Sequence, residues 1–397
     1  MTQLYRGGLA RWATEAAEET DSGRRRLSNQ WGWDTLGWQA PPRSSSVCVL
    51  FVYRYERNAA SALPRRDLDE AQRHCRRMLA PVKDTTDLPR SPGSPSVIRC
   101  VACGVEGEHV VRETAWVRSN VRAFRDRRFA IWRCACCQSL HARDEVDLDE
   151  YYAAYPFFSV RPDFRLRVLY DNQLHRLECA GLRRDHEILD HGCGAGLFLQ
   201  HLSERGYREV RGYDRYAGAF SDRSVVEGTY DCVLSQDVIE HVADPRALLA
   251  TLDSLCKPGG VIAIGTPNAD AIDLRVPERY VHAIHLPYHR HILSRQALLM
   301  AAIERDWRLE RYYPTQYANT GVPFLNSRFY QFYAERLDAT LDCLMEAPQP
   351  GALASRLPEA LFWALAGHLY AEETDVMFVF RKLRRAHCHI SEAGAHR

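Results

Sequence analysis

Residues 188–198, which read Ile-Leu-Asp-His-Gly-Cys-Gly-Ala-Gly-Leu-Phe, decide the fold of this chain. An apolar run ends at Asp190, and three glycines follow before a new apolar pattern begins: Gly192, Gly194 and Gly196. This order predicts a strand, a tight loop and a helix start, where missing Cβ atoms let a nucleoside ligand approach the backbone. A dinucleotide-binding loop has its third glycine one residue later. The spacing therefore predicts a nucleoside site of another kind.

Length and composition set the limits of the problem. A chain of 397 residues is long enough for two or three domains. A net charge of +1 gives no bulk basicity for nucleic acid. The apolar run at 47–53 is too short for a membrane span or a secretory signal. We therefore expect a cytoplasmic protein whose thirteen cysteines are reduced, some of them binding metal.

The chain divides into three parts by composition. Residues 1–95 are rich in Pro, Ser and Arg and are expected to be largely disordered or poorly packed. Residues 96–145 form a small cysteine-bearing module, and 146–397 form the main domain. In that domain apolar runs alternate with helical patterns, which predicts a parallel α/β sheet. Strands are expected at 187–190, 209–213, 231–235, 260–265, 308–313 and 375–382.

The second of these strands ends at Asp214, 18 residues after Gly196. In a doubly wound fold this position faces the crevice above the strand ends, where a carboxylate can accept the ribose hydroxyl protons. Further motifs follow in order: Tyr-Asp-Cys-Val at 230–233, Ile-Glu-His-Val-Ala-Asp-Pro at 239–245, Leu-Cys-Lys-Pro-Gly-Gly at 255–260 and Gly-Thr-Pro-Asn at 265–268.

With the glycine loop, these motifs resemble the class I methyltransferases that use S-adenosylmethionine (SAM). Within them they resemble the branch of ubiquinone-type O-methyltransferases and natural-product methyltransferases. The resemblance covers 187 to about 315. It implies an α/β, doubly wound, Rossmann-like sheet whose last strand, 375–382, is antiparallel. The helical, aromatic-rich text at about 315–373 is then a lid insertion.

The resemblance also implies the residues of the cofactor site. The floor of the site would be Asp190, Gly192, Gly194 and Gly196, with Asp214 on the ribose. Gln236 and Asp237 would lie beside the sulfonium and the acceptor entrance, and the following Glu240 and His241 would be structural.

One segment departs from the family pattern. Only 16 residues separate Asp214 from Asp231. A helix, a third strand and the acidic turn that contacts adenine do not fit in so short a segment. We expect residues 217–226 to supply a shortened substitute.

A metal site is expected upstream. Two Cys-x-x-Cys pairs stand with 30 residues between them: Cys100 with Cys103, and Cys134 with Cys137. Two such turns on a small hairpin sheet give the geometry of a structural zinc ribbon. A different ligand, Cys136 or His141, is the alternative. A ribbon ahead of a class I domain resembles the sugar C-methyltransferases and also some rRNA methyltransferases.

Four histidines follow the family's fifth strand: His282, His285, His289 and His291. A neutral imidazole there can take a proton from a hydroxyl or an acidic carbon as the methyl group transfers. The run at 288–291 resembles the Tyr-His-x-His segment of sugar C-methyltransferases, which favours His289 as the base and His291 second, with Asp237 beside them. A second metal site and simple capping of the next helix are the alternatives.

The sequence thus predicts a SAM-dependent methyltransferase with a structural zinc ribbon. Its acceptor is expected to be a small molecule, methylated on oxygen or carbon, with neither nucleic acid nor membrane as a partner. One alternative is an RNA methyltransferase that uses the ribbon to bind nucleic acid, because the ribbon carries several arginines. The other is a non-catalytic scaffold of the same fold, because the adenine segment is short.

Overall fold

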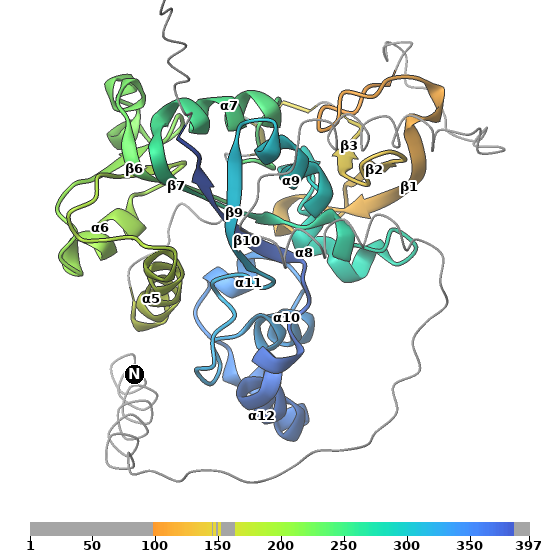
Figure 1. Ribbon diagram of the computed structural model, residues 1–397. Coiled ribbons are helices and arrows are strands. Elements are labelled where there is room, and N and C mark those ends of the chain that lie inside the picture. Colours follow the sequence, from red (N-terminus) through yellow and green to blue (C-terminus); the bar gives the residue numbers. More distant parts are fainter. Residues whose placement is uncertain (1–97, 145, 148–149, 152–162, 385–397) are drawn as a thin grey trace, which may run out of the picture. The chain divides into compact units, whose positions relative to one another are not determined.

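The computed structural model describes residues 98–144, 146–147, 150–151 and 163–384 (Figure 1). The expectation of a disordered or poorly packed 1–95 lies outside these residues. The described chain contains two sheets with helices packed against them.

The larger sheet has six strands in the order β5-β4-β6-β7-β10-β9. The bounds of these strands are β4 Ile188–His191, β5 Val210–Tyr213, β6 Tyr230–Gln236, β7 Cys256–Pro267, β9 Trp307–Tyr313 and β10 Asp375–Lys382. Strands β5, β4, β6 and β7 pair in parallel, and β10 pairs antiparallel with both β7 and β9. The mixed α/β fold, the six strands and the antiparallel last strand predicted from the sequence are confirmed.

The sheet is buried on both faces, which explains its nearly continuous apolar strands. Along β10, Val376, Phe378 and Phe380 join one hydrophobic cluster, while Met377 and Val379 join the other. This alternation follows the period of two in a strand. The sheet is therefore the middle layer between two cores.

Helices cover each face. Helices α5 (Phe164–Cys179) and α6 (Leu197–Glu204) contribute to the core that contains Met377 and Val379. Helices α7 (Pro245–Leu255) and α9 (Arg295–Ile303) contribute to the other core. Side-chain caps begin three of these helices: Asp163 for α5, Asp244 for α7 and Ser294 for α9.

The segment between β5 and β6 is short, as expected. It consists of two 3-10 turns, Gly218–Phe220 and Arg223–Glu227. Between Asp214 and Tyr230, all of which the structure describes, there is no strand and no α-helix. The sheet therefore ends at β5 on this side.

The insertion before β10 is helical, as the sequence predicts. It contains α10 (Ser327–Arg336), α11 (Asp342–Met345) and α12 (Leu357–Ala366), drawn in blue in Figure 1. Helix α10 packs on α11 and α12. Within the described residues, no helix has both the length and the apolar character needed to cross a membrane.

The smaller sheet has the order β1-β2-β3-β8. Its strands are β1 Val111–Arg118, β2 Arg128–Cys134, β3 Leu140–Ala142 and β8 His291–Ile292. Strand β8 and the short helix α8 (Val281–Ile284) come from the segment after β7. A further cluster joins β1–β3 to that segment, with Ile131 and Leu140 on one side and Ile284 and Tyr288 on the other. The cysteine module and the segment after β7 therefore share a core.

Candidate functional site

The glycine loop lies between the end of β4 and the start of α6. Gly192, Gly194 and Gly196 all have positive φ angles, of 91°, 53° and 74°. A Cβ at Gly196 would meet the ring of Phe220, whereas a Cβ at Gly194 would meet no atom within 4 Å. The loop is thus packed by protein at Gly196 and open at Gly194, which is the side where a ligand can approach the backbone.

Asp214, at the end of β5, holds this loop. Its Oδ2 accepts a hydrogen bond from the Gly194 N–H at 2.9 Å. Its Oδ1 accepts from the N–H groups of Tyr216 at 2.8 Å and Ala217 at 3.0 Å. A carboxylate oxygen can accept two hydrogen bonds, so Oδ2 retains the capacity for one more donor beside Gly194. The carboxylate therefore lies next to the open side of the loop.

Asp190 lies at the end of β4 and is only 5% exposed. Burial, and then the negative charge of Asp214, raise the pKa of the Asp190 carboxyl to about 7. Two carboxyls of like charge thus flank the glycine loop, an arrangement that favours a ligand carrying positive charge or hydroxyl donors.

We expect an Asp190→Asn variant to be more stable than the wild-type protein at neutral pH. The pKa of this carboxyl is near 4 in the unfolded protein and about 7 in the folded protein. Between about pH 4 and pH 7 the carboxyl is therefore protonated in the folded state and ionised in the unfolded state. The wild-type free energy of unfolding therefore falls as pH rises from about 4 to about 7 and then levels off. Asn carries no charge, so the advantage of the variant should grow over the same window, reaching on the order of a few kcal/mol.

Urea unfolding at several pH values between 4 and 8 measures this difference. Asp222→Asn is the matched control, because the exposed Asp222 only caps a 3-10 turn and its pKa is lowered by the hydrogen bonds from Ser224. An Asp190→Asn advantage that stays constant with pH would contradict the interpretation.

Asp237 follows β6 at the same edge of the sheet, with a left-handed φ of 55°. Burial, and then the charge of Asp375, raise the pKa of its carboxyl to about 7. Gln236 Nε2 donates to Asp237 Oδ1 at 2.8 Å. The structure thus places Gln236 and Asp237 side by side at the carboxyl end of the strand next to β4.

The sequence reasoning missed two tyrosines at this edge. Tyr317 follows β9, and its ring stacks on that of Tyr170 from α5 at a centroid distance of 6.3 Å. Burial raises the pKa of both phenols, and the charges of Asp190 and Asp237 add to the effect in both. The two phenols therefore lie among the carboxyls of the site. No local pattern distinguishes them, because the residues around them are far apart in the sequence.

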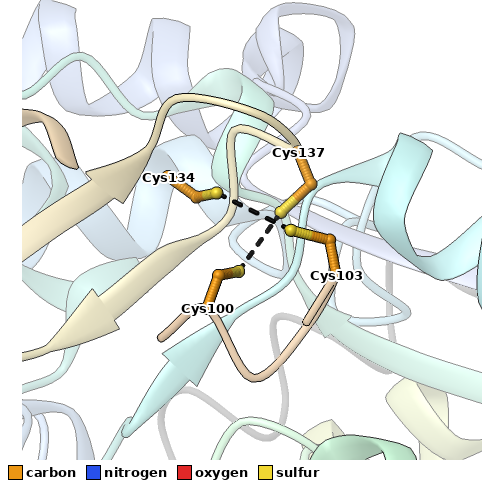
Figure 2. Close-up of side chains that lie close together, drawn as sticks. All are labelled: Cys100, Cys103, Cys134 and Cys137. Atoms are coloured by element: carbon orange, nitrogen blue, oxygen red, sulfur yellow. Dashed lines mark hydrogen bonds between the residues drawn. The ribbon is translucent and has the colours of Figure 1, made fainter. Parts of the chain in front are cut away.

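The four predicted cysteines come together in a second place (Figure 2). Their sulfur atoms all lie within 4.8 Å of one another. Cys100 Sγ is 3.6 Å from Cys137 Sγ, and Cys103 Sγ is 3.8 Å from Cys134 Sγ. Tetrahedral zinc with Zn–S bonds of about 2.3 Å requires sulfur atoms about 3.8 Å apart. Four thiols at this spacing fit a zinc ion.

The alternative ligand His141 lies beside this cluster. Its Nε2 is 3.2 Å from Cys100 Sγ, and its Nδ1 is 3.1 Å from His291 Nδ1. His141 therefore lies in contact with both the cysteine cluster and the histidine segment.

The cysteine module is tied to the segment after β7 by polar contacts. Arg133 on β2 is 6% exposed and donates to the carbonyls of Ala269 and Ile272. The Ser294 hydroxyl, which caps α9, donates to the carbonyl of Cys137. The module therefore braces the chain that leaves β7.

The four predicted histidines lie in this braced segment, and each makes a contact through Nδ1. His282 contacts Asn120 Nδ2 and His285 contacts Asn120 Oδ1. His289 donates to the Ala283 carbonyl at 2.9 Å. Burial lowers the pKa of His289 well below its ordinary value, so this imidazole is neutral.

His291 differs from His289, because contacts involve both of its ring nitrogens. Its Nε2 is 3.1 Å from the Ala243 carbonyl, and its Nδ1 contacts His141. The carbonyl requires Nε2 to donate, which leaves Nδ1 as the acceptor from His141. His291 therefore joins the cysteine module to the loop after β6.

Comparison with known proteins agrees with this geometry. A family described as "Methyltransferase domain" matches residues 164–327. The ubiquinone biosynthesis O-methyltransferase of Caulobacter vibrioides is 31% identical over 129 residues, which are 26% of this chain and 51% of that protein. The protein of the same name from Bordetella avium is 28% identical over 166 residues, 36% of this chain and 66% of that protein. The chain thus spans about half of the first of these relatives.

Solved structures give the same kind of similarity at lower identity. A SAM-dependent methyltransferase from Mesorhizobium loti is 18% identical, with a TM-score of 0.33, and the match covers 53% of this chain and 99% of that one. A SAM-dependent methyltransferase from Archaeoglobus fulgidus is also 18% identical, with a TM-score of 0.33, covering 58% and 99%.

The family match covers the strands that carry the glycine loop, Asp214 and Asp237. The antiparallel β10 is the last strand that the resemblance implied. Residues 164–327 therefore carry a methyltransferase domain, which is similar to the class I SAM-dependent methyltransferases.

Proposed function

We propose that this protein transfers the methyl group of SAM to a small-molecule acceptor, on oxygen or on carbon. The observation that carries the proposal is the open side of Gly194 next to the Asp214 carboxylate. In this proposal the cofactor is held by Asp190, Gly192, Gly194, Gly196, Asp214, Gln236 and Asp237. The bound cofactor would supply an electrophilic methyl group on a sulfonium.

The residues of the chain would orient the acceptor and take its proton. Methyl transfer is a direct displacement, so most of the rate enhancement comes from alignment of the two reactants. A hydroxyl or acidic carbon must lose a proton as the new bond forms. The pKa of about 7 at Asp237 suits a base that works near neutral pH, and the unprotonated imidazole of His289 is the second candidate.

Among the proposed catalytic residues, His291 has a different role in this scheme. Both of its ring nitrogens are in contact, with Ala243 and with His141. We therefore assign His291 to positioning the acceptor side, and leave proton transfer to Asp237 and His289.

The four cysteines would hold a structural zinc ion. Their sulfur spacing fits zinc, and four thiolates leave no open position for chemistry. We also propose a ribbon at 96–145 and a methyltransferase domain at 146–397 with a lid at about 315–373. Reduced thiols of this kind suit the cytoplasm, which we propose as the compartment.

Charge pairing on the ribbon favours a small molecule over RNA as the acceptor. Arg118 pairs with Glu278, and Arg122 pairs with Asp338 and Glu346. Arg133 is buried against backbone carbonyls. For these arginines, phosphate binding would have to compete with existing carboxylate or carbonyl partners.

A Gly194→Ala variant tests the cofactor site, and we expect it to bind SAM at least about tenfold more weakly than the wild-type protein. The added methyl group meets no protein atom within 4 Å, so it would occupy the space left for the ligand. Isothermal titration with SAM and with its demethylated product, S-adenosylhomocysteine (SAH), measures the effect.

The control is Gly206→Ala, at the other end of α6. Gly206 also has a positive φ, of 88°, and its nearest neighbour is the end of the flexible Arg184 side chain. Both variants carry the same kind of backbone strain. Equal SAM affinities in the two variants would overturn the assignment of the loop, and a wild-type protein that binds neither SAM nor SAH would support the scaffold alternative.

A further inference from the structure

We propose that Glu240, His241 and His289 bind a divalent metal ion at a second site, separate from the four cysteines. Each of these residues offers one ligand atom, and the three atoms lie within 4.8 Å of one another. Glu240 and His241 follow β6, whereas His289 comes from the segment between α8 and β8. The site would therefore join the two stretches of chain on the acceptor side of the domain.

The Glu240 carboxylate provides the first observation. This residue is fully buried, and its Oε2 accepts a hydrogen bond from the Thr266 hydroxyl at 3.1 Å. Its other oxygen, Oε1, is buried without a hydrogen-bond partner. A buried carboxylate oxygen in this state is costly unless a proton or a cation neutralises it.

The His289 imidazole provides the second observation. Its Nδ1 donates to the Ala283 carbonyl, so the neutral ring has its lone pair on Nε2. That Nε2 lies 3.9 Å from Glu240 Oε1. Two electron-rich atoms facing each other need a positive centre between them. A shared proton would bring them to about 2.8 Å, whereas two ligands bonded at about 2 Å to one ion stand roughly 3 to 4 Å apart.

His241 completes a set typical of metal sites. Its Nδ1 lies 3.2 Å from the Tyr288 carbonyl, which places Nε2 on the other side of the ring. The rings of His241 and His289 are 4.8 Å apart and nearly perpendicular. Metal-binding histidines commonly donate their second nitrogen to a carbonyl in this way, because the contact fixes the ring and its tautomer.

The donor set indicates the class of metal. Two imidazoles and one carboxylate suit Zn²⁺ and similar borderline cations better than Mg²⁺ or Ca²⁺, which take mainly oxygen ligands. Asp237 stands three residues before Glu240 and adds a second carboxyl to this part of the chain. Two neighbouring carboxyls favour a cation. With its lone pair on the metal, His289 could not serve as a base, and Asp237 would take the acceptor proton.

Cobalt titration of the full-length protein tests the proposal, because cobalt reports its ligands by absorption. After chelator treatment under reducing, anaerobic conditions, we expect the wild-type protein to bind two equivalents of Co²⁺. One equivalent should show the charge-transfer bands of thiolate ligands. The other should add only the weaker visible bands of nitrogen and oxygen ligands.

Variants assign the second equivalent to its ligands. Glu240→Gln and His289→Gln should each bind one equivalent and keep the thiolate bands, while His175→Gln, an exposed histidine on α5, should bind two. A wild-type protein that binds one equivalent, with thiolate bands alone, would overturn the proposal even if the variants fail to fold. SAH binding by the same samples reports on the methyltransferase assignment separately.

Discussion

A Cys134→Ser variant is expected to lose the zinc ion that we propose for the four cysteines, together with the ordered packing of the segment that the cysteine module contacts. Cys134 is fully buried, and its Sγ lies 3.8 Å from Cys103 Sγ inside the cluster. A hydroxyl is a much poorer zinc ligand than a thiolate. Zinc binding in small four-ligand sites supplies on the order of 10 kcal/mol or more, and folding depends on it.

The effect should spread beyond the module, because β3 pairs with β8 and the Cys137 carbonyl accepts a hydrogen bond from the Ser294 hydroxyl. Hydrogen exchange should show lost protection in β1–β3 and reduced protection at 281–294. Helices α5 and α6 should retain their protection, because they pack in the opposite core, which does not contain the module. Loss confined to β1–β3 would contradict the shared-core interpretation.

Cys179→Ser is the matched control. Cys179 ends α5, is exposed and lies outside the cluster. Metal content by elemental analysis should be unchanged in this variant. A Cys134→Ser protein that keeps its full metal content would show that the cysteines do not hold the ion.

Local patterns accounted for most of the fold. The strands were predictable because an apolar run of four to eight residues between turns is typical of a buried strand. The glycine loop and the acid at the end of β5 were predictable because their spacing is set by the turn and the helix between them. The grouping of the four cysteines was predictable from their two short Cys-x-x-Cys turns in the same way.

The acceptor side was much less predictable. His141 and His291 contact each other across 150 residues, and Asn172 donates to the Tyr317 carbonyl across 145. No periodicity or spacing encodes such pairs, because they depend on how separate elements pack. The sequence singled out the histidines as a group, and the backbone carbonyls and the carboxylate that distinguish one from another became visible only in the fold.

The Asp214→Ala variant is expected to bind SAH at least about 100-fold more weakly than the wild-type protein. The carboxylate accepts three backbone hydrogen bonds, from Gly194, Tyr216 and Ala217. Hydrogen bonds to a charged group are worth about 1.5–3 kcal/mol each, and each 1.4 kcal/mol is tenfold in affinity. Asp222→Ala is the control, because Asp222 is an exposed cap in the same β5–β6 segment.

Loss of binding alone would not separate the two roles of Asp214, which are holding the loop and contacting the ribose. Comparing SAH with an analogue that lacks one ribose hydroxyl separates them. If the carboxylate contacts the ribose, removing the hydroxyl weakens binding to the wild-type protein by about tenfold and has little further effect in Asp214→Ala. If Asp214 only holds the loop, the hydroxyl matters equally in both proteins. Oδ2 already accepts from Gly194 and has room for one more donor, so we expect the coupling to appear for one of the two hydroxyls.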